Sequence, residues 1–263
     1  MDPFVIRVIV SFVVGGALIA LFSLIAEKYP RVGGVIIALP STLVVSFVFI
    51  GLTQSATAAS HAAIATLANL GPATLCLAGL IRVQKGGRPI SDILFGLTAG
   101  IIIWLVPAVV LVRIGVPNVM IAVMVFTLFL FPAAYFLRQK TDVKAPPVGR
   151  YSFAHKLTRA CVGGALIALS VWLAKTAGST VGGVIASFPV VITTTILFIR
   201  SQRPVESIRI IGKRLPDGMA LLAGFTVLVI YSYPAFGVGW GTVFSLAITV
   251  LLSFLRILIV QRS

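Results

Sequence analysis

The residues best placed to do chemistry form a motif that occurs twice. Val32-Gly-Gly-Val-Ile36 is followed by Pro40, and Val181-Gly-Gly-Val-Ile185 is followed by Pro189. A proline inside a helix removes one backbone hydrogen bond and clashes with the carbonyl four residues earlier, so each motif predicts a broken helix. The second half of such a helix begins at the proline, and its N-terminal end carries partial positive charge. Two such ends that face each other can hold an anion or a polar group.

Small and hydroxyl-bearing residues accompany both prolines and complete a candidate binding site. The predicted site consists of Gly33, Gly34, Pro40, Ser41, Thr42, Gly182, Gly183, Ser187, Pro189, Thr193 and Thr194. The other interpretation is structural: the prolines kink their helices, the glycines allow close helix packing, and the hydroxyls bond back to their own helix. Repetition of the motif favours a binding role, because both copies kept it while the loops around them diverged.

Other reactive groups are scarce, and this scarcity excludes several functions. The acidic residues all lie at or near predicted helix ends or in loops: Asp2, Glu27, Asp92, Asp142, Glu206 and Asp217. No carboxylate is therefore predicted inside the membrane as a proton relay. No nucleophile with a base is apparent, and neither His61 nor His155 has a second ligand at metal-binding spacing. We expect no enzyme activity, no metal and no cofactor.

Three basic residues stand apart from the rest. Arg7, Arg113 and Lys175 fall on the predicted outer face, where they could line a vestibule that collects anions. The alternative is that they are ordinary helix-end residues whose charged groups reach the membrane surface.

The elements that must position these residues are membrane helices. Of the 263 residues, 59% are hydrophobic and 10% charged, and the mean hydropathy is +1.12. A bilayer core about 30 Å thick needs roughly 20 apolar residues per helix. Apolar runs between Gly, Pro and charged residues predict an all-α polytopic protein with about nine transmembrane helices: 4–26, 33–53, 62–82, 92–113, 118–137, 155–175, 181–200, 217–234 and 239–259.

Lys and Arg predict the orientation, since cytoplasmic segments carry them in excess. With the N-terminus outside and the C-terminus cytoplasmic, 18 of the 21 basic residues fall on the inner side. The net charge of +15 then reflects membrane topology, so we expect no nucleic-acid partner. The predicted location is the plasma (inner) membrane of a prokaryote, with the lipid bilayer as partner and a homo-oligomer left open.

An internal repeat relates the two halves of the chain. Residues 14–21 recur unchanged as residues 162–169, an offset of 148, and the two Gly-Gly motifs recur at an offset of 149. Helices 1 to 4 thus correspond to helices 6 to 9, and the fifth has no counterpart. The predicted organisation is a first repeat of five helices over 1–137, a cytoplasmic linker over 138–154, and a second repeat of four helices over 155–263.

A shift of five helices predicts that the second repeat enters the membrane from the opposite side. Inverted repeats are typical of secondary transporters, whose halves exchange conformations around a central site. We therefore expect a secondary transporter or facilitator for a small polar or anionic solute. An anionic-lipid flippase or scramblase, and a membrane assembly partner without transport activity, are the alternatives.

The run from Tyr29 to Ser41 and its echo from Val181 to Pro189 resemble the glycine-to-proline signature of small GlpM-like membrane proteins. The resemblance covers about a tenth of the chain and implies no particular activity. The inverted-repeat plan is also similar to that of the drug/metabolite transporter superfamily and of bile-acid-symporter-like folds. The chain lacks their tenth helix and their diagnostic motifs.

Overall fold

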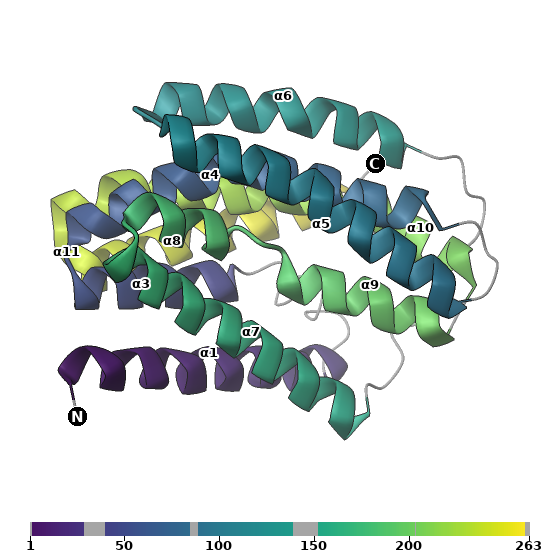
Figure 1. Ribbon diagram of the computed structural model, residues 1–263, viewed down its shortest axis with the longest axis horizontal. Helices are drawn as coiled ribbons and strands as arrows, with labels where there is room; N and C mark the ends of the chain where they lie inside the picture. Colours follow the sequence, from purple (N-terminus) through teal and green to yellow (C-terminus); the bar gives the residue numbers. More distant parts are fainter. Residues whose placement is uncertain (1, 29–39, 85–88, 139–151, 203, 261–263) are drawn as a thin grey trace.

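The computed structural model describes residues 2–28, 40–84, 89–138, 152–202 and 204–260, which form helices joined by short connections (Figure 1). The predicted all-α fold class is confirmed for these residues. The helices are α1 (Pro3–Lys28), α3 (Ser41–Thr53), α4 (Ala56–Arg82), α5 (Pro89–Ile114), α6 (Val119–Leu137), α7 (Phe153–Thr176), α8 (Ser179–Ala186), α9 (Val190–Gln202), α10 (Val205–Gly212) and α11 (Leu215–Val260).

Length and composition make the described helices those of a membrane protein. Seven segments of the described chain are long and apolar enough to cross a bilayer, with α8 and α9 counted together. Large apolar side chains also cover the outside of the fold: Met120, Phe131 and Tyr135 of α6 expose 71%, 71% and 77% of their surface. Exposed apolar area of this kind is suited to lipid rather than to water.

The longest helix, α11, contains a sharp reversal. Gly237 has φ 73° and ψ 174°, a conformation that residues with a Cβ rarely adopt. The reversal separates residues 215–236 from residues 238–260, and each part is long enough to cross a bilayer. The predicted boundary between the spans at 217–234 and 239–259 coincides with this glycine.

One sequence-based boundary and one expected loop are wrong. We predicted that the third span begins at residue 62, but α4 begins at Ala56, because the Ser55 hydroxyl accepts a hydrogen bond from the amide of Ala58 and caps the helix. The segment between the seventh and eighth spans was expected to be a loop. It contains α10, whose Val205 and Ile208 are buried.

The predicted break at Pro189 is present. α8 ends at Ala186 and α9 begins at Val190, so the span predicted at 181–200 consists of two half-helices. In the other copy of the motif, α3 begins at Ser41, directly after Pro40. Residues 29–39, which precede it, lie outside the described part of the chain.

The two halves of the sequence share one hydrophobic core. α4 is buried along most of its length and packs against α5, α6, α8 and α11. Leu67 and Leu77 of α4 belong to the same cluster of buried side chains as Phe225 and Val229 of α11. α1 lies alongside α7 (Figure 1). Of the predicted linker at 138–154, residues 139–151 lie outside the described ranges.

Candidate functional site

The two half-helices that begin at the prolines meet at a central pocket of about 70 Å³. The start of α3 and the break between α8 and α9 form most of its wall, and α4 and α11 complete it. A single water needs roughly 10–15 Å³ of such a cavity, so a few waters or one small solute group would fill it. The lining residues are Pro40, Ser41, Thr42, Leu43, Leu70, Ala186, Ser187, Phe188, Pro189, Val190, Val191, Ile192, Gly218, Met219 and Leu222.

Most of this lining consists of residues related by the internal repeat. An offset of 149 relates the stretch from Pro40 to Leu43 to the stretch from Pro189 to Ile192, and both stretches line the pocket. The same offset relates Leu70 of α4 to Met219 of α11. The pocket therefore lies between equivalent surfaces of the two halves.

Backbone geometry at the two half-helix starts is also equivalent. The amide of Val44 donates to the carbonyl of Pro40 at 2.8 Å, and the amide of Thr193 donates to that of Pro189 at 2.9 Å. No side chain caps the start of α3. The first-turn N–H groups of a helix have no partner within it, so they are the natural donors to an anion or polar group in this pocket.

A buried amide stands behind the pocket wall. Asn69 of α4 is fully buried, and its Nδ2 donates to the hydroxyl of Ser187 at 2.8 Å. Its Oδ1 has no hydrogen-bond partner. Sequence analysis missed Asn69, although a lone amide within an apolar span was a usable signal. The amide fixes the Ser187 hydroxyl, which also donates to the carbonyl of Val184 at 2.6 Å.

Those predicted site residues that the structure describes fall into three groups. Pro40, Ser41, Thr42, Ser187 and Pro189 line the pocket. Thr193 and Thr194 lie on α9 beyond it: the hydroxyl of Thr194 bonds back to the carbonyl of Val190, and that of Thr193 is buried without a partner. Gly33 and Gly34 lie outside the described residues.

Gly182 and Gly183 form the third group and serve helix packing. A Cβ on Gly183 would clash with the carbonyl oxygen of Ala62, and one on Gly182 would clash with the Cβ of Ala174. These glycines let α8 pack directly against the backbones of α4 and α7. Their effect on the pocket is therefore indirect, since they position the helix that ends at Ser187.

The crossing of α1 and α7 supports the central site and contains reciprocal contacts. A Cβ on Gly15 would meet Ile167, and a Cβ on Gly163 would meet Ile19. These are equivalent contacts, because an offset of 148 relates Gly15 to Gly163 and Ile19 to Ile167.

A second reciprocal pair brings the two backbones together. A Cβ on Gly16 would lie 3.0 Å from the carbonyl oxygen of Ala160, and one on Gly164 would lie 2.6 Å from that of Phe12. The same offset relates these residues. Each contact from α1 to α7 thus has a counterpart from α7 to α1 between the repeat-related residues. Such reciprocal contacts are typical of a twofold interface.

The predicted outer residues do not line the central pocket. Arg7 donates a hydrogen bond to the carbonyl of Leu52 at the end of α3. Arg113 and Lys175 are exposed in the last turns of α5 and α7. Arg7 thus closes a helix end, and no described contact joins the three residues into one vestibule.

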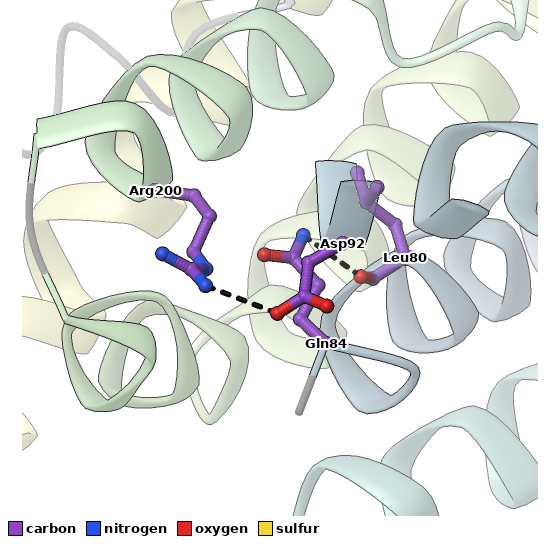
Figure 2. A network of polar contacts seen from close by, with 4 residues as sticks. All are labelled: Leu80, Gln84, Asp92 and Arg200. Carbon is purple, nitrogen blue, oxygen red and sulfur yellow. Dashed lines mark hydrogen bonds and ion pairs between the residues drawn. The ribbon is translucent and has the colours of Figure 1, made fainter. Parts of the chain in front are cut away.

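One ion pair links the halves away from the pocket (Figure 2). Arg200 of α9 contacts Asp92 of α5 at 3.1 Å, with side-chain exposures of 5% and 16%. The nearby Gln84 is buried, and its Nε2 donates to the carbonyl of Leu80 at 3.1 Å. Sequence analysis placed Arg200 and Asp92 at helix ends on the same side, but it did not predict that they pair.

No cluster of three His, Cys, Asp or Glu that could hold a metal is present among the described residues. Cys76 is buried and Cys161 is exposed, and neither forms a disulfide. No protein-family model matches the chain, and no curated protein and no solved structure shows significant similarity to it. The resemblance to GlpM-like proteins therefore stays a prediction.

Proposed function

We propose that this chain is a secondary transporter or facilitator that moves a small polar or anionic solute across the plasma membrane through the central pocket. The observation that carries the proposal is the meeting of the two proline-headed half-helices at one pocket with repeat-related walls. Discontinuous helices that meet near the membrane midplane are the usual binding site of secondary transporters. The following features support this function.

The first support is the reciprocal packing of α1 and α7. Two segments related by an inverted repeat exchange places under a twofold axis in the membrane plane, and each contact then has a counterpart. The contacts of Gly15 and Gly163, and those of Gly16 and Gly164, fit this expectation. Such an axis would let the halves exchange conformations and open the pocket to either side in turn.

The arrangement of helix ends supports nine spans with an outside N-terminus. The start of α1, the end of α7 and the reversal of α11 lie at one end of the fold, and the end of α9 and α10 lie at the other (Figure 1). The first end carries Arg7, Arg113 and Lys175. The second carries Arg82, Arg138, Lys156, Arg159, Arg200, Arg209, Lys213 and Arg214. This charge excess favours a cytoplasmic location for the second end.

The chemistry of the pocket favours a small anionic or polar solute. Partial positive charge from two helix starts is combined with the hydroxyls of Ser41, Thr42 and Ser187. Among the described lining residues none is acidic, so a cation would find no countercharge. The small volume excludes a bulky substrate in this conformation.

A lipid flippase is the nearest alternative, and one groove bears on it. A groove of about 430 Å³ between α1 and α7 is lined by Val8, Ile9, Phe12, Ala165, Ala168, Leu169 and Trp172. A headgroup that crosses a membrane needs polar partners along its path. This groove offers apolar side chains almost throughout, whereas the hydroxyls lie in the central pocket. The comparison favours a solute carrier.

The test is a ligand screen followed by transport. Purified protein would be heated with a panel of small solutes, including phosphate, sulfate, nitrate, short carboxylates and polyols, and the melting temperature measured. A solute that binds raises the melting temperature, because at 100 times its Kd it adds about 2.7 kcal/mol to the free energy of unfolding. We expect Thr42→Val to lose this shift, whereas Thr127→Val on the exposed face of α6 retains it.

Flux of the same solute into proteoliposomes would then establish transport. Movement of fluorescent phosphatidylglycerol between leaflets, without solute flux, would identify the flippase instead. Absence of both activities in folded protein would contradict the proposal and favour an assembly role.

A further inference from the structure

The two helix starts that meet at the central pocket differ in the side chains they bring to it. Ser41 and Thr42, at the start of α3, contribute two hydroxyl-bearing residues to its wall. An offset of 149 relates them to Val190 and Val191 at the start of α9, which also line the pocket. Ser41 and Thr42 are partly exposed, and the hydroxyl of neither bonds to another described residue. Free hydroxyls are therefore on the α3 side, and the α9 side offers methyl groups.

The third hydroxyl of the lining, that of Ser187, is already engaged. Its single hydrogen goes to the carbonyl of Val184 at 2.6 Å, and its oxygen accepts from Nδ2 of Asn69 at 2.8 Å. The amide of Val190 likewise donates to the carbonyl of Phe188 at 2.8 Å. A hydroxyl has only one hydrogen, so Ser187 has none left for an anion. The side-chain donors for an anion are thus at the start of α3.

The wall formed by α11 is apolar and leaves space. Met219 and Leu222 line it, and Leu70 of α4 lines the wall nearby. Gly218 also lines the pocket, and a Cβ there would meet nothing within 4 Å. The equivalent position in the first repeat is Asn69, at an offset of 149. The second repeat thus has no side chain where the first has a polar one.

Charge and size narrow the class of ligand. Among the described residues that line the pocket, none is acidic and none is basic. The cost of burying an ion rises with the square of its charge, and helix starts supply only partial positive charge. The pocket therefore favours one negative charge over two. At roughly 10–15 Å³ for each water-sized group, the volume of about 70 Å³ holds about five or six non-hydrogen atoms.

We propose that the central pocket binds a short monocarboxylate of about two to four carbons. The carboxylate lies at the start of α3, where its oxygens accept hydrogen bonds from Ser41 and Thr42. The alkyl group packs against Val190 and Val191, and burial of each methylene there strengthens binding. This inference rests on the proposed transport function and names the class of solute, but binding can be measured without transport.

A series of anions tests the proposal. The melting temperature of the full-length protein in detergent would be followed during titration with the sodium salts of acetate, propionate, butyrate, hexanoate, nitrate and sulfate. Sodium gluconate, which is too large for the pocket, would keep the ionic strength constant. The concentration dependence of the melting temperature gives each apparent Kd. We expect propionate and butyrate to bind more tightly than acetate, nitrate and sulfate, and hexanoate not to bind.

Three variants locate the two ends of the ligand. Thr42→Val keeps the size of the side chain and should weaken every carboxylate about tenfold, because a hydrogen bond to a charged group is lost. Val191→Thr, at the repeat-related position, should weaken butyrate about fivefold and acetate less than twofold, because it places a hydroxyl against the alkyl group. Gly218→Ala fills the open space and should weaken butyrate about tenfold but acetate little. Thr127→Val and Val123→Thr on α6 are matched controls and should leave each affinity within twofold.

The outcomes separate this inference from the proposed function. Nitrate or sulfate that binds as tightly as propionate, or no binding of any carboxylate, would overturn the inference. Equal losses of acetate and butyrate in Val191→Thr would overturn the placement of the alkyl group. Propionate binding without flux into proteoliposomes would support the site and contradict transport, whereas sulfate flux without carboxylate binding would do the reverse. If Gly218→Ala does not fold, Thr42→Val and Val191→Thr carry the test, because both keep the side-chain size.

Discussion

Positions related by the internal repeat make the same contacts where α1 crosses α7, but they make different contacts at the helix ends. At the crossing, Gly16 and Gly164 make equivalent close contacts with the backbone of the other half. At the ends, the related positions Gly51 and Arg200 differ: Gly51 packs against Val238 of α11, whereas Arg200 pairs with Asp92 of α5. Both contacts join the end of a proline-headed half-helix to the helix beside it.

The contacts at the crossing are required by the packing of the fold, whereas the residues at each end depend on the surroundings of that end. Two helix backbones can approach closely only where side chains are absent, so both halves kept glycine at the crossing. At the ends either kind of contact joins the two helices, so the residue type there can differ between the two halves. The charged version is at the end that is rich in Lys and Arg, which is the arrangement expected of an inverted repeat.

The largest effect is expected at the tightest backbone contact of the crossing. A Cβ on Gly164 would lie 2.6 Å from the carbonyl oxygen of Phe12, and a backbone atom cannot move aside. Gly164→Ala should therefore cost about 3 kcal/mol, near the upper end of overpacking effects. SDS titration in mixed micelles would measure the free energy of unfolding. Gly224→Ala is the control, since a Cβ there meets nothing within 4 Å.

The counterpart Gly16→Ala should cost less, about 1 kcal/mol, because its Cβ would lie 3.0 Å from the carbonyl oxygen of Ala160. The same titration compares the two variants directly. An equal loss from Gly224→Ala, or no loss from Gly164→Ala, would show that the crossing is not closely packed.

An effect between those of Gly164→Ala and Gly16→Ala is expected from the ion pair at the charged end. Asp92→Asn keeps the shape of the side chain but removes the charge that Arg200 contacts, and should cost about 2 kcal/mol, the range of hydrogen bonds to charged groups. Unfolding titrations of Asp92→Asn, Arg200→Gln and the double variant would form a double-mutant cycle. Additive losses would mean that the two residues are not coupled.

An effect as small as that of Gly16→Ala is expected at the uncharged counterpart of this contact. A Cβ on Gly51 would lie 2.5 Å from a methyl carbon of Val238, a side-chain atom that can shift more easily than a backbone atom, so Gly51→Ala should cost about 1 kcal/mol. The melting temperature in detergent would be measured beside that of Asp92→Asn. A greater loss from Gly51→Ala would reverse the proposed division between the two ends.

Local sequence patterns predicted the helices and the break at Pro189 because apolar length, proline and glycine act over a few residues. They also predicted that Pro40, Ser41, Thr42, Ser187 and Pro189 would gather, since the repeat placed the two motifs in equivalent helices. The start of α4 was missed because the alanine-rich stretch after Ser55 is too weakly apolar to mark a span. α10 was missed because its charged residues, Glu206 and Arg209, mask two buried apolar positions.

Contacts between distant segments could not be predicted from such patterns. The pairing of Arg200 with Asp92 joins residues 108 apart, and the bond from Asn69 to Ser187 joins residues 118 apart. Neither spacing is visible in a single sequence. The packing role of Gly182 and Gly183 likewise depends on which helices lie next to α8.

The most direct test of the inverted arrangement is the accessibility of single cysteines from each side of the membrane. Thr57→Cys, in the first turn of α4 just after α3, and Gln202→Cys, the last residue of α9, are both exposed and lie at the ends of equivalent half-helices. In a background with Cys76→Ala and Cys161→Ala, a membrane-impermeant maleimide should label position 57 only from outside and position 202 only from inside. Labelling of both positions from the same side would contradict the inverted repeat and remove the main support for transport through the central pocket.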